Sequence, residues 1–144
     1  MARDVTDGEI EMDEARAFLA RAEVGFRKGD LEEIIALFAE DVRVLFADFP
    51  PMVGRRAYRD FLESRLRRQL NYTPTTTVRV VNGNVIGSSW EATWTDAVTG
   101  SPMRGRGCEF VTIGGGLVVD FVASFNAWDD GGPPRTPITM APAE

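Results

Sequence analysis

Two stretches near the start of the chain carry apolar residues at helical spacing. The first follows Asp13, a predicted N-cap, and stops at Gly29, a residue type that favours the left-handed backbone at helix C-termini. The second follows Asp30, a strong N-cap, and Glu33 three residues later completes a capping box. The pattern therefore predicts two short helices that meet at a tight Gly-Asp turn.

A strand and a third helix are predicted next. The apolar run 42–46 favours a strand, which the pair Pro50-Pro51 interrupts. The helix begins after Gly54 and turns its apolar residues inward, namely Tyr58, Phe61, Leu62, Leu66 and Leu70. Its arginines are expected mostly on the solvent side, namely Arg55, Arg56, Arg59, Arg65, Arg67 and Arg68.

The second half of the chain has β-rich runs in place of helical spacing. Runs 75–81 and 85–95 are joined by Asn82-Gly83-Asn84, a strong hairpin signal. Runs 102–113 and 117–128 flank three consecutive glycines, which form a turn. Helices followed by a long antiparallel meander predict an α+β domain with the helices on one face of the sheet.

The ends of the chain lack this patterning. Residues 1–12 are acidic and predict a flexible lead-in, and residues 129–144 are rich in proline and glycine and predict a tail without regular structure. The domain itself is expected over 13–128.

The amino-acid composition excludes several kinds of functional site. The 144 residues include one cysteine and no histidine, so internal disulfides, paired-Cys or His metal sites and Ser-His-Asp triads are excluded. We expect no metal and no cofactor. A net charge of −6 argues against a nucleic-acid partner. Because no signal segment or membrane-spanning run is present, we expect a soluble cytoplasmic protein without a membrane partner.

Several segments together resemble a known family. The run 28–44 is similar to the helix–helix–strand opening of SnoaL-like proteins in the nuclear transport factor 2-like superfamily. Gly54 with 58–62 resembles the start of their third helix, and the segment from Cys108 through the glycine turn to Asn126 resembles their last hairpin. The resemblance covers most of the chain.

The resemblance implies a cone, in which a strongly curved antiparallel sheet and three helices enclose an apolar pocket. It also implies a homodimer formed through the outer face of the sheet. Members of the family use the pocket for isomerisation, dehydration, cyclisation or epoxide hydrolysis, or for simple binding, so the fold alone does not fix the function.

The catalytic positions of ketosteroid isomerases are not filled here. Those enzymes use a tyrosine on the first helix, an aspartate on the first strand and a protonated aspartate on the penultimate strand. The resemblance places Ala22, Phe46 and Cys108 there. None of these side chains can do that work, so the usual ketosteroid isomerase mechanism is excluded.

Two further mechanisms of the family are also excluded. The Asp-Arg-Asp set of limonene-epoxide hydrolases would fall near Trp90, Ala92 and Ala123, none of which can replace it. The His-Asp pair of the cyclases fails because the chain has no histidine, and the aspartate near the end of the last strand corresponds to Asn126.

Strand alternation combined with the resemblance predicts the walls of the pocket. Three sets of residues are expected to face inward, namely Trp90, Ala92 and Trp94; Arg104, Arg106, Cys108 and Phe110; and Phe121, Ala123 and Phe125. The predicted ligand-binding residues are Phe46, Tyr58, Trp90, Trp94, Cys108, Phe121 and Phe125. Aromatic walls with a guanidinium near the rim suit a small hydrophobic molecule bearing an anionic or carbonyl oxygen.

Asp48 is the predicted acid/base. It lies two residues beyond Phe46 and in an extended strand points the same way, so apolar neighbours would raise its pKa. Arg106 is its predicted oxyanion partner. Each residue also has an interpretation without a function. Asp48 would be a solvated loop aspartate, Arg106 would form a surface ion pair, and Cys108 would be a buried, unreactive side chain.

Two functions follow from these residues. The first is a cofactor-free enzyme of cyclase, dehydratase or isomerase type, and the second is a non-catalytic ligand-binding or dimeric assembly domain. Burial of Asp48 would favour the enzyme. The outer sheet face is expected to carry Glu91, Glu109, Val122, Ser124, Asn126 and Trp128, and its exposed tryptophan predicts the dimer interface.

Overall fold

The structure, a computed structural model, describes residues 8–140. Within this range the chain forms the helices α1 (Met12–Lys28), α2 (Leu31–Ile35) and α3 (Arg55–Arg68). The strands are β1 (Phe38–Phe46), β2 (Met52–Val53), β3 (Gln69–Asn82), β4 (Val85–Asp96), β5 (Pro102–Gly114) and β6 (Leu117–Asp129). The α+β class predicted from the sequence is confirmed.

Local capping chemistry sets the turn between α1 and α2. Gly29 ends α1 with a φ of 65°, and the Asp30 side chain accepts a hydrogen bond of 3.1 Å from the Glu33 backbone N–H. The prediction that Asp13 is the N-cap of this helix is wrong, because Glu11 is at the N-cap position and Asp13 lies in the first turn of α1. The carboxylate of Glu33 pairs with Lys28 at 3.3 Å.

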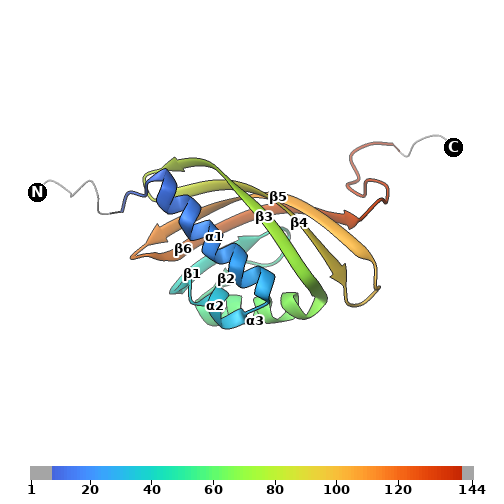
Figure 1. Cartoon of the computed structure of the whole chain (residues 1–144), viewed down its shortest axis with the longest axis horizontal. Helices are drawn as coiled ribbons and strands as arrows, with labels where there is room; N and C mark the ends of the chain where they lie inside the picture. Colours follow the sequence, from blue (N-terminus) through green and yellow to red (C-terminus); the bar gives the residue numbers. More distant parts are fainter. Residues whose placement is uncertain (1–7, 141–144) are drawn as a thin grey trace, which may run out of the picture.

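The strands form one mixed sheet in the order β2-β1-β6-β5-β4-β3 (Figure 1). The meander from β3 to β6 is antiparallel, as predicted. The expectation of an all-antiparallel sheet is wrong, because β1 runs parallel to β6. The chain makes this parallel pairing through a long crossover, in which α3 and the four strands β2 to β5 separate the two partners.

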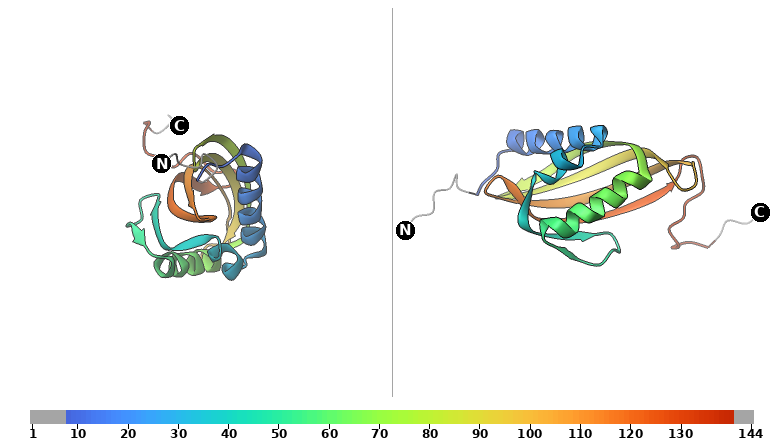
Figure 2. Two further views of the ribbon diagram at one scale, coloured as in Figure 1. Left: turned by 90° about the vertical axis from the view of Figure 1, so that its left-hand side faces the viewer. Right: turned by 90° about the horizontal axis from the view of Figure 1, so that it is seen from below.

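The sheet curls strongly without closing, and the helices cover its concave side (Figure 2). Register shifts in β3 between Leu70 and Thr73, and between Val78 and Val80, accompany this curvature. Asn71, at a φ of 54°, lies in the first shift. Leu70, predicted on the inner side of the third helix, instead belongs to β3 and is 43% exposed.

The core lies between the three helices and the concave face. Ala15, Ile34, Val42, Tyr58 and Leu62 are almost completely buried there. A second cluster joins it toward the open end of the sheet and contains Tyr72, Trp90, Ala92 and Trp94.

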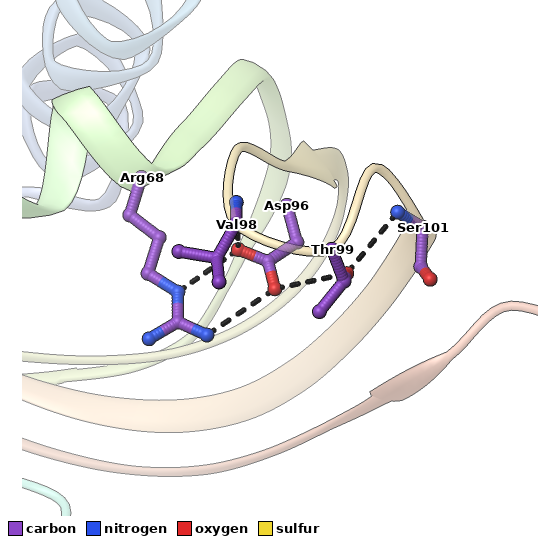
Figure 3. Close-up of polar contacts among 5 residues, drawn as sticks. All are labelled: Arg68, Asp96, Val98, Thr99 and Ser101. Carbon is purple, nitrogen blue, oxygen red and sulfur yellow. Dashed lines mark hydrogen bonds and ion pairs between the residues drawn. The ribbon is translucent and has the colours of Figure 1, made fainter.

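One ion pair fastens α3 to the turn between β4 and β5 (Figure 3). Nε and one terminal nitrogen of Arg68 donate to the two carboxylate oxygens of Asp96 at 2.9 and 3.2 Å. Asp96 also accepts from the Val98 backbone N–H and the Thr99 hydroxyl, and these bonds shape the turn. The Arg68 guanidinium and these donors lower the pKa of Asp96 to about 2.

The two ends of the domain are partly tied down. The Ile10 backbone N–H donates to the Gly83 carbonyl at 2.9 Å, so the described part of the predicted lead-in contacts the β3–β4 turn. Residues 130–140 contain no helix or strand, and Thr136 accepts a 2.8 Å hydrogen bond from Asn126. The remaining parts of the two predicted end segments, 1–7 and 141–144, lie outside the described residues. No helix in 8–140 is long and apolar enough to cross a membrane.

Candidate functional site

A small cavity of about 70 Å³ lies between α1 and the concave face of the sheet. Most of its lining is apolar, and residues from α1, α3 and five strands contribute. Its aromatic walls include Phe18, Phe26, Phe38, Phe46, Tyr72, Trp90 and Phe121. Three side chains of charged residue types also line it, namely Glu23, Arg65 and Glu109.

Hydrogen bonds from α1 to β3 hold one wall in place. The carboxylate of Glu23 accepts a hydrogen bond from the Thr76 backbone N–H. One turn later, Arg27 donates to the Pro74 carbonyl at 2.7 Å. The bond to Thr76 already engages one carboxylate oxygen of Glu23, so this acid serves the structure of the wall.

The inner face of β5 is lined by glycines beneath two tryptophans. A Cβ added to Gly105 would lie 2.9 Å from the Trp94 indole, and one added to Gly107 would lie 3.0 Å from the Trp90 indole. The indoles therefore occupy space that only glycine leaves free. Alternation from these glycines brings Glu109 and Val111 inward.

The prediction of which β5 side chains face the cavity is consequently wrong, because the inward positions are shifted by one residue along the strand. Arg104, Arg106, Cys108 and Phe110 lie on the outer face and are exposed, whereas Glu109, predicted outside, lines the cavity. A shift of one residue exchanges the two faces of a strand. Two glycines at alternate positions of β5, next to two tryptophans four residues apart on β4, are the sequence signal that would have revealed the correct facing.

Glu109 is the half-buried acid on β5 that lines the cavity. Its carboxylate accepts a 2.9 Å hydrogen bond from the Ser88 hydroxyl on β4. Burial raises the pKa of Glu109, while the bond from Ser88 and the positive charge of Arg65 oppose that rise. A carboxyl group in such surroundings can hold or release a proton nearer to neutral pH than an exposed glutamate.

Arg65 is the cation of the site, contrary to its predicted position on the solvent side. Its guanidinium carbon lies 5.2, 5.0 and 4.8 Å from the ring centroids of Phe26, Phe46 and Tyr72. Nε donates a 2.7 Å hydrogen bond to the Gln69 side chain. These distances fit cation–π contacts with three rings.

Asp48 lies outside the cavity, in the exposed turn after β1. The prediction assumed that the extended strand continues past Phe46. The next residue, Ala47, has a φ of 49°, which ends the alternation and turns the chain away. Asp48 therefore does not meet the burial condition for an acid/base residue, and the alternative of a solvated loop aspartate is confirmed.

The predicted catalytic pair is not brought together at the cavity either. Arg106 lies on the outer face, where its guanidinium carbon is 5.5 Å from the Trp128 ring centroid. Cys108 is exposed on the same face.

The other predicted ligand-binding residues are divided between two hollows. Phe46, Trp90 and Phe121 line the cavity. Trp94 and Phe125 line a neighbouring cleft of about 390 Å³ at the open end of the sheet. Within residues 8–140, no three acidic or cysteine side chains gather to form a candidate metal site.

Tyr58 lies in the core beside the cavity. It is completely buried against Phe38, Phe61 and Phe121, and its hydroxyl has no hydrogen-bond partner among the described residues. Burial raises the pKa of this phenol well above its usual range. The ring therefore supports the wall formed by Phe38 and Phe121.

Solved structures similar to this chain come from several enzyme types. A putative polyketide cyclase from Xanthomonas campestris pv. campestris has a TM-score of 0.66 and 21% identity, covering 78% of this chain and 90% of its own. A putative ketosteroid isomerase from Kribbella flavida has a TM-score of 0.63 and 24% identity, covering 90% and 91%. SalBIII, an epoxide hydrolase/cyclase-like enzyme in the formation of the salinomycin pyran ring, has a TM-score of 0.71 and 14% identity, covering 81% and 93%.

These likenesses show the fold. A search of the curated proteins found no match. The family of SnoaL-like domains matches residues 15–121, which include most of α1, all of α3, the lining of the cavity and Glu109. The resemblance inferred from the sequence is confirmed, and this chain belongs to the SnoaL-like domain family.

Proposed function

We propose that the chain binds a small hydrophobic molecule in the cavity and the adjoining cleft of about 390 Å³, which share Phe46 and Arg65, and that Glu109 exchanges a proton with it. The observation that carries this proposal is an ionisable carboxyl group inside a cavity whose other walls are mostly aromatic and aliphatic. Apolar walls with few polar groups are typical of sites for small organic ligands. The reaction class is cofactor-free acid/base chemistry of the cyclase, dehydratase or isomerase type.

Glu109 meets the criterion that Asp48 fails. An acid/base residue must be desolvated and within reach of the ligand, and Glu109 lines the cavity whereas Asp48 lies in an exposed turn. Three residues stood at the catalytic positions of ketosteroid isomerases, namely Ala22, Phe46 and Cys108. Ala22 and Phe46 do line the cavity, but on the penultimate strand the residue that faces the cavity is Glu109 and not Cys108. Within residues 8–140, proton transfer at the cavity therefore has one candidate carboxyl group, that of Glu109, whose side-chain hydrogen bond comes from Ser88.

Binding is tested first with a neutral flat probe, 2-naphthol, in a protein-observed NMR titration. We expect binding to the native chain and at least a tenfold loss with Ala22→Phe, because a phenyl ring at this lining position fills the cavity. Val24→Phe is the matched control, since Val24 is on the same helix and 44% exposed. Absence of binding, or equal affinity in both variants, would overturn the proposed ligand site.

Catalysis is tested by the ring opening of 5-nitrobenzisoxazole, in which a base removes the ring C–H proton and the N–O bond breaks to give a cyanophenolate. We expect Glu109→Gln to lower the rate at least about 100-fold, the usual contribution of a positioned base. Glu23→Gln, at the second cavity carboxylate, is expected to keep the native rate within about threefold, because its oxygen is held by Thr76. Binding without a rate above buffer would favour the alternative, a non-catalytic binding domain.

We also propose that the outer sheet face joins two copies of the chain. Phe110 and Val80 are 55% and 50% exposed, and they lie side by side over Gly87. The same face carries Glu91 and Arg106, charges of both signs that suit a two-fold interface between identical surfaces. Analytical ultracentrifugation of the native chain and of Phe110→Glu tests this, with a dimer expected only for the native chain. A native monomer at micromolar concentration would refute it.

A further inference from the structure

Arg65 lies at the boundary between two hollows. With Phe46 it lines both the inner cavity, which holds Glu109, and the outer cleft of about 390 Å³. The cleft is walled by Phe49, Phe61, Trp94, Met103 and Phe125. A molecule too large for the inner cavity would therefore occupy the cleft and contact Arg65 before reaching Glu109.

The guanidinium of Arg65 is held in place without a carboxylate. It forms no ion pair within residues 8–140, and its hydrogen bond to Gln69 uses one of its five N–H donors. Arg68, one turn later at the same cleft, is fully engaged with Asp96. Arg65 is thus the arginine of the cleft whose charge is not neutralised by the protein.

The surroundings of Arg65 fit an anion-binding role. The rings of Phe26, Phe46 and Tyr72 fix the guanidinium plane, which reduces the entropy lost when the planar fork binds a carboxylate. A cation in partly apolar surroundings also attracts an anion more strongly than one in water. Glu109 lines the same cavity, and its carboxyl group disfavours a second anionic group there.

We propose that Arg65 binds the anionic group of the ligand, and that the ligand class is a flat, apolar molecule with a single carboxylate or equivalent oxyanion. The apolar body of the ligand lies in the cleft and the inner cavity, and its uncharged end faces Glu109. This inference rests on the proposed function, since it identifies the ligand of the same site.

The test compares two probes of the same shape, 2-naphthoate and 2-naphthamide, by isothermal titration calorimetry at low and moderate salt. A hydrogen bond to a charged group contributes about 1.5–3 kcal/mol, so we expect the native chain to prefer the carboxylate by about tenfold or more. Arg65→Gln should remove that preference while affinity for the amide stays within about twofold. Arg65→Lys, which keeps the charge, should retain part of it.

Arg67→Gln is the matched control, because Arg67 is an exposed arginine of the same helix that lines neither hollow, and it should keep the preference. Equal affinity of the native chain for both probes, or an unchanged preference in Arg65→Gln, would overturn the anion-binding role alone. If neither probe binds the native chain, the ligand site itself is refuted, and this inference with it. The comparison of the two probes on the native chain needs no variant to fold.

Discussion

The indole of Trp94 covers Gly105 on the neighbouring strand, where an added Cβ would lie only 2.9 Å from the ring. Trp90 covers Gly107 in the same way. The two pairs fix which face of β5 looks inward and so place Glu109 in the cavity. The position of Glu109 in the cavity therefore depends on the packing of the two tryptophans against Gly107 and Gly105, which lie two and four residues before Glu109 in β5.

Gly105→Ala should destabilise the fold by about 1–3 kcal/mol, the usual cost of overpacking. The added methyl group meets a rigid indole, which cannot move aside like the end of a flexible chain. Urea unfolding measures the change, and Arg104→Ala on the exposed face of β5 is the control. A loss below about 0.5 kcal/mol, the range of ordinary surface changes, would contradict the tight packing.

The contribution of Glu109 to the stability of the native chain should fall as pH rises above about 4.3, the usual pKa of glutamate in an unfolded chain. Because burial raises the pKa of Glu109, the folded state binds more protons than the unfolded state between the two pKa values. Glu109→Gln removes this dependence, so it should be more stable than the native chain at neutral pH and indistinguishable near pH 4.

Urea unfolding from pH 4 to pH 8 measures the difference between the two curves. Glu91→Gln is the control, because Glu91 is exposed on the outer face of the neighbouring strand. Parallel curves for the native chain and Glu109→Gln would show that the carboxyl group of Glu109 is solvated in the folded state.

Asp96 should give the opposite pH dependence. Its pKa is lowered to about 2, chiefly by the hydrogen bonds from Arg68, so its contribution to stability is present above the unfolded value of about 3.9 and is lost as pH falls toward 2. Asp96→Asn should be less stable at neutral pH and lose less stability on acidification. Thermal unfolding between pH 2 and pH 7 measures both effects. Asp130→Asn, which breaks the exposed pair with Arg104, should change neither, and an equal effect of the two variants would contradict the assignment.

The helices could be predicted because their signals are local. Gly29 and Asp30 mark the α1–α2 turn through their own backbone and side chain, and Gly54 precedes α3 as expected. The antiparallel hairpins followed from turn chemistry for the same reason. The parallel pairing of β1 with β6 could not be predicted from such signals, because residues 47–116, about half of the chain, separate the two strands.

The site was predicted less well because it depends on register. Alternation along β5 was correct, but its phase is set by contacts of Gly105 and Gly107 with another strand. Asp48 was misplaced by extending β1 one residue beyond the point where Ala47 turns the chain. Arg65 could not be distinguished by composition from the other arginines of α3, since only the curvature of the sheet brings Phe26, Phe46 and Tyr72 around it.

Tyr58→Phe should leave the fold as stable as the native chain or stabilise it by about 1 kcal/mol, because burying a hydroxyl without a partner costs about 1–3 kcal/mol. The hydroxyl is buried and unpartnered within the described residues, and the ring supplies the packing. Tyr58→Ala, which removes the ring, should cost about 3–5 kcal/mol.

Urea unfolding of both variants checks these values, and a 2-naphthol titration of Tyr58→Phe checks the role of the hydroxyl in binding. Since Tyr58 supports the cavity wall without lining it, affinity should stay within about twofold. A large loss of stability in Tyr58→Phe would mean that the hydroxyl is hydrogen-bonded in solution, and a large loss of affinity alone would restore it to the ligand site, as the sequence had predicted.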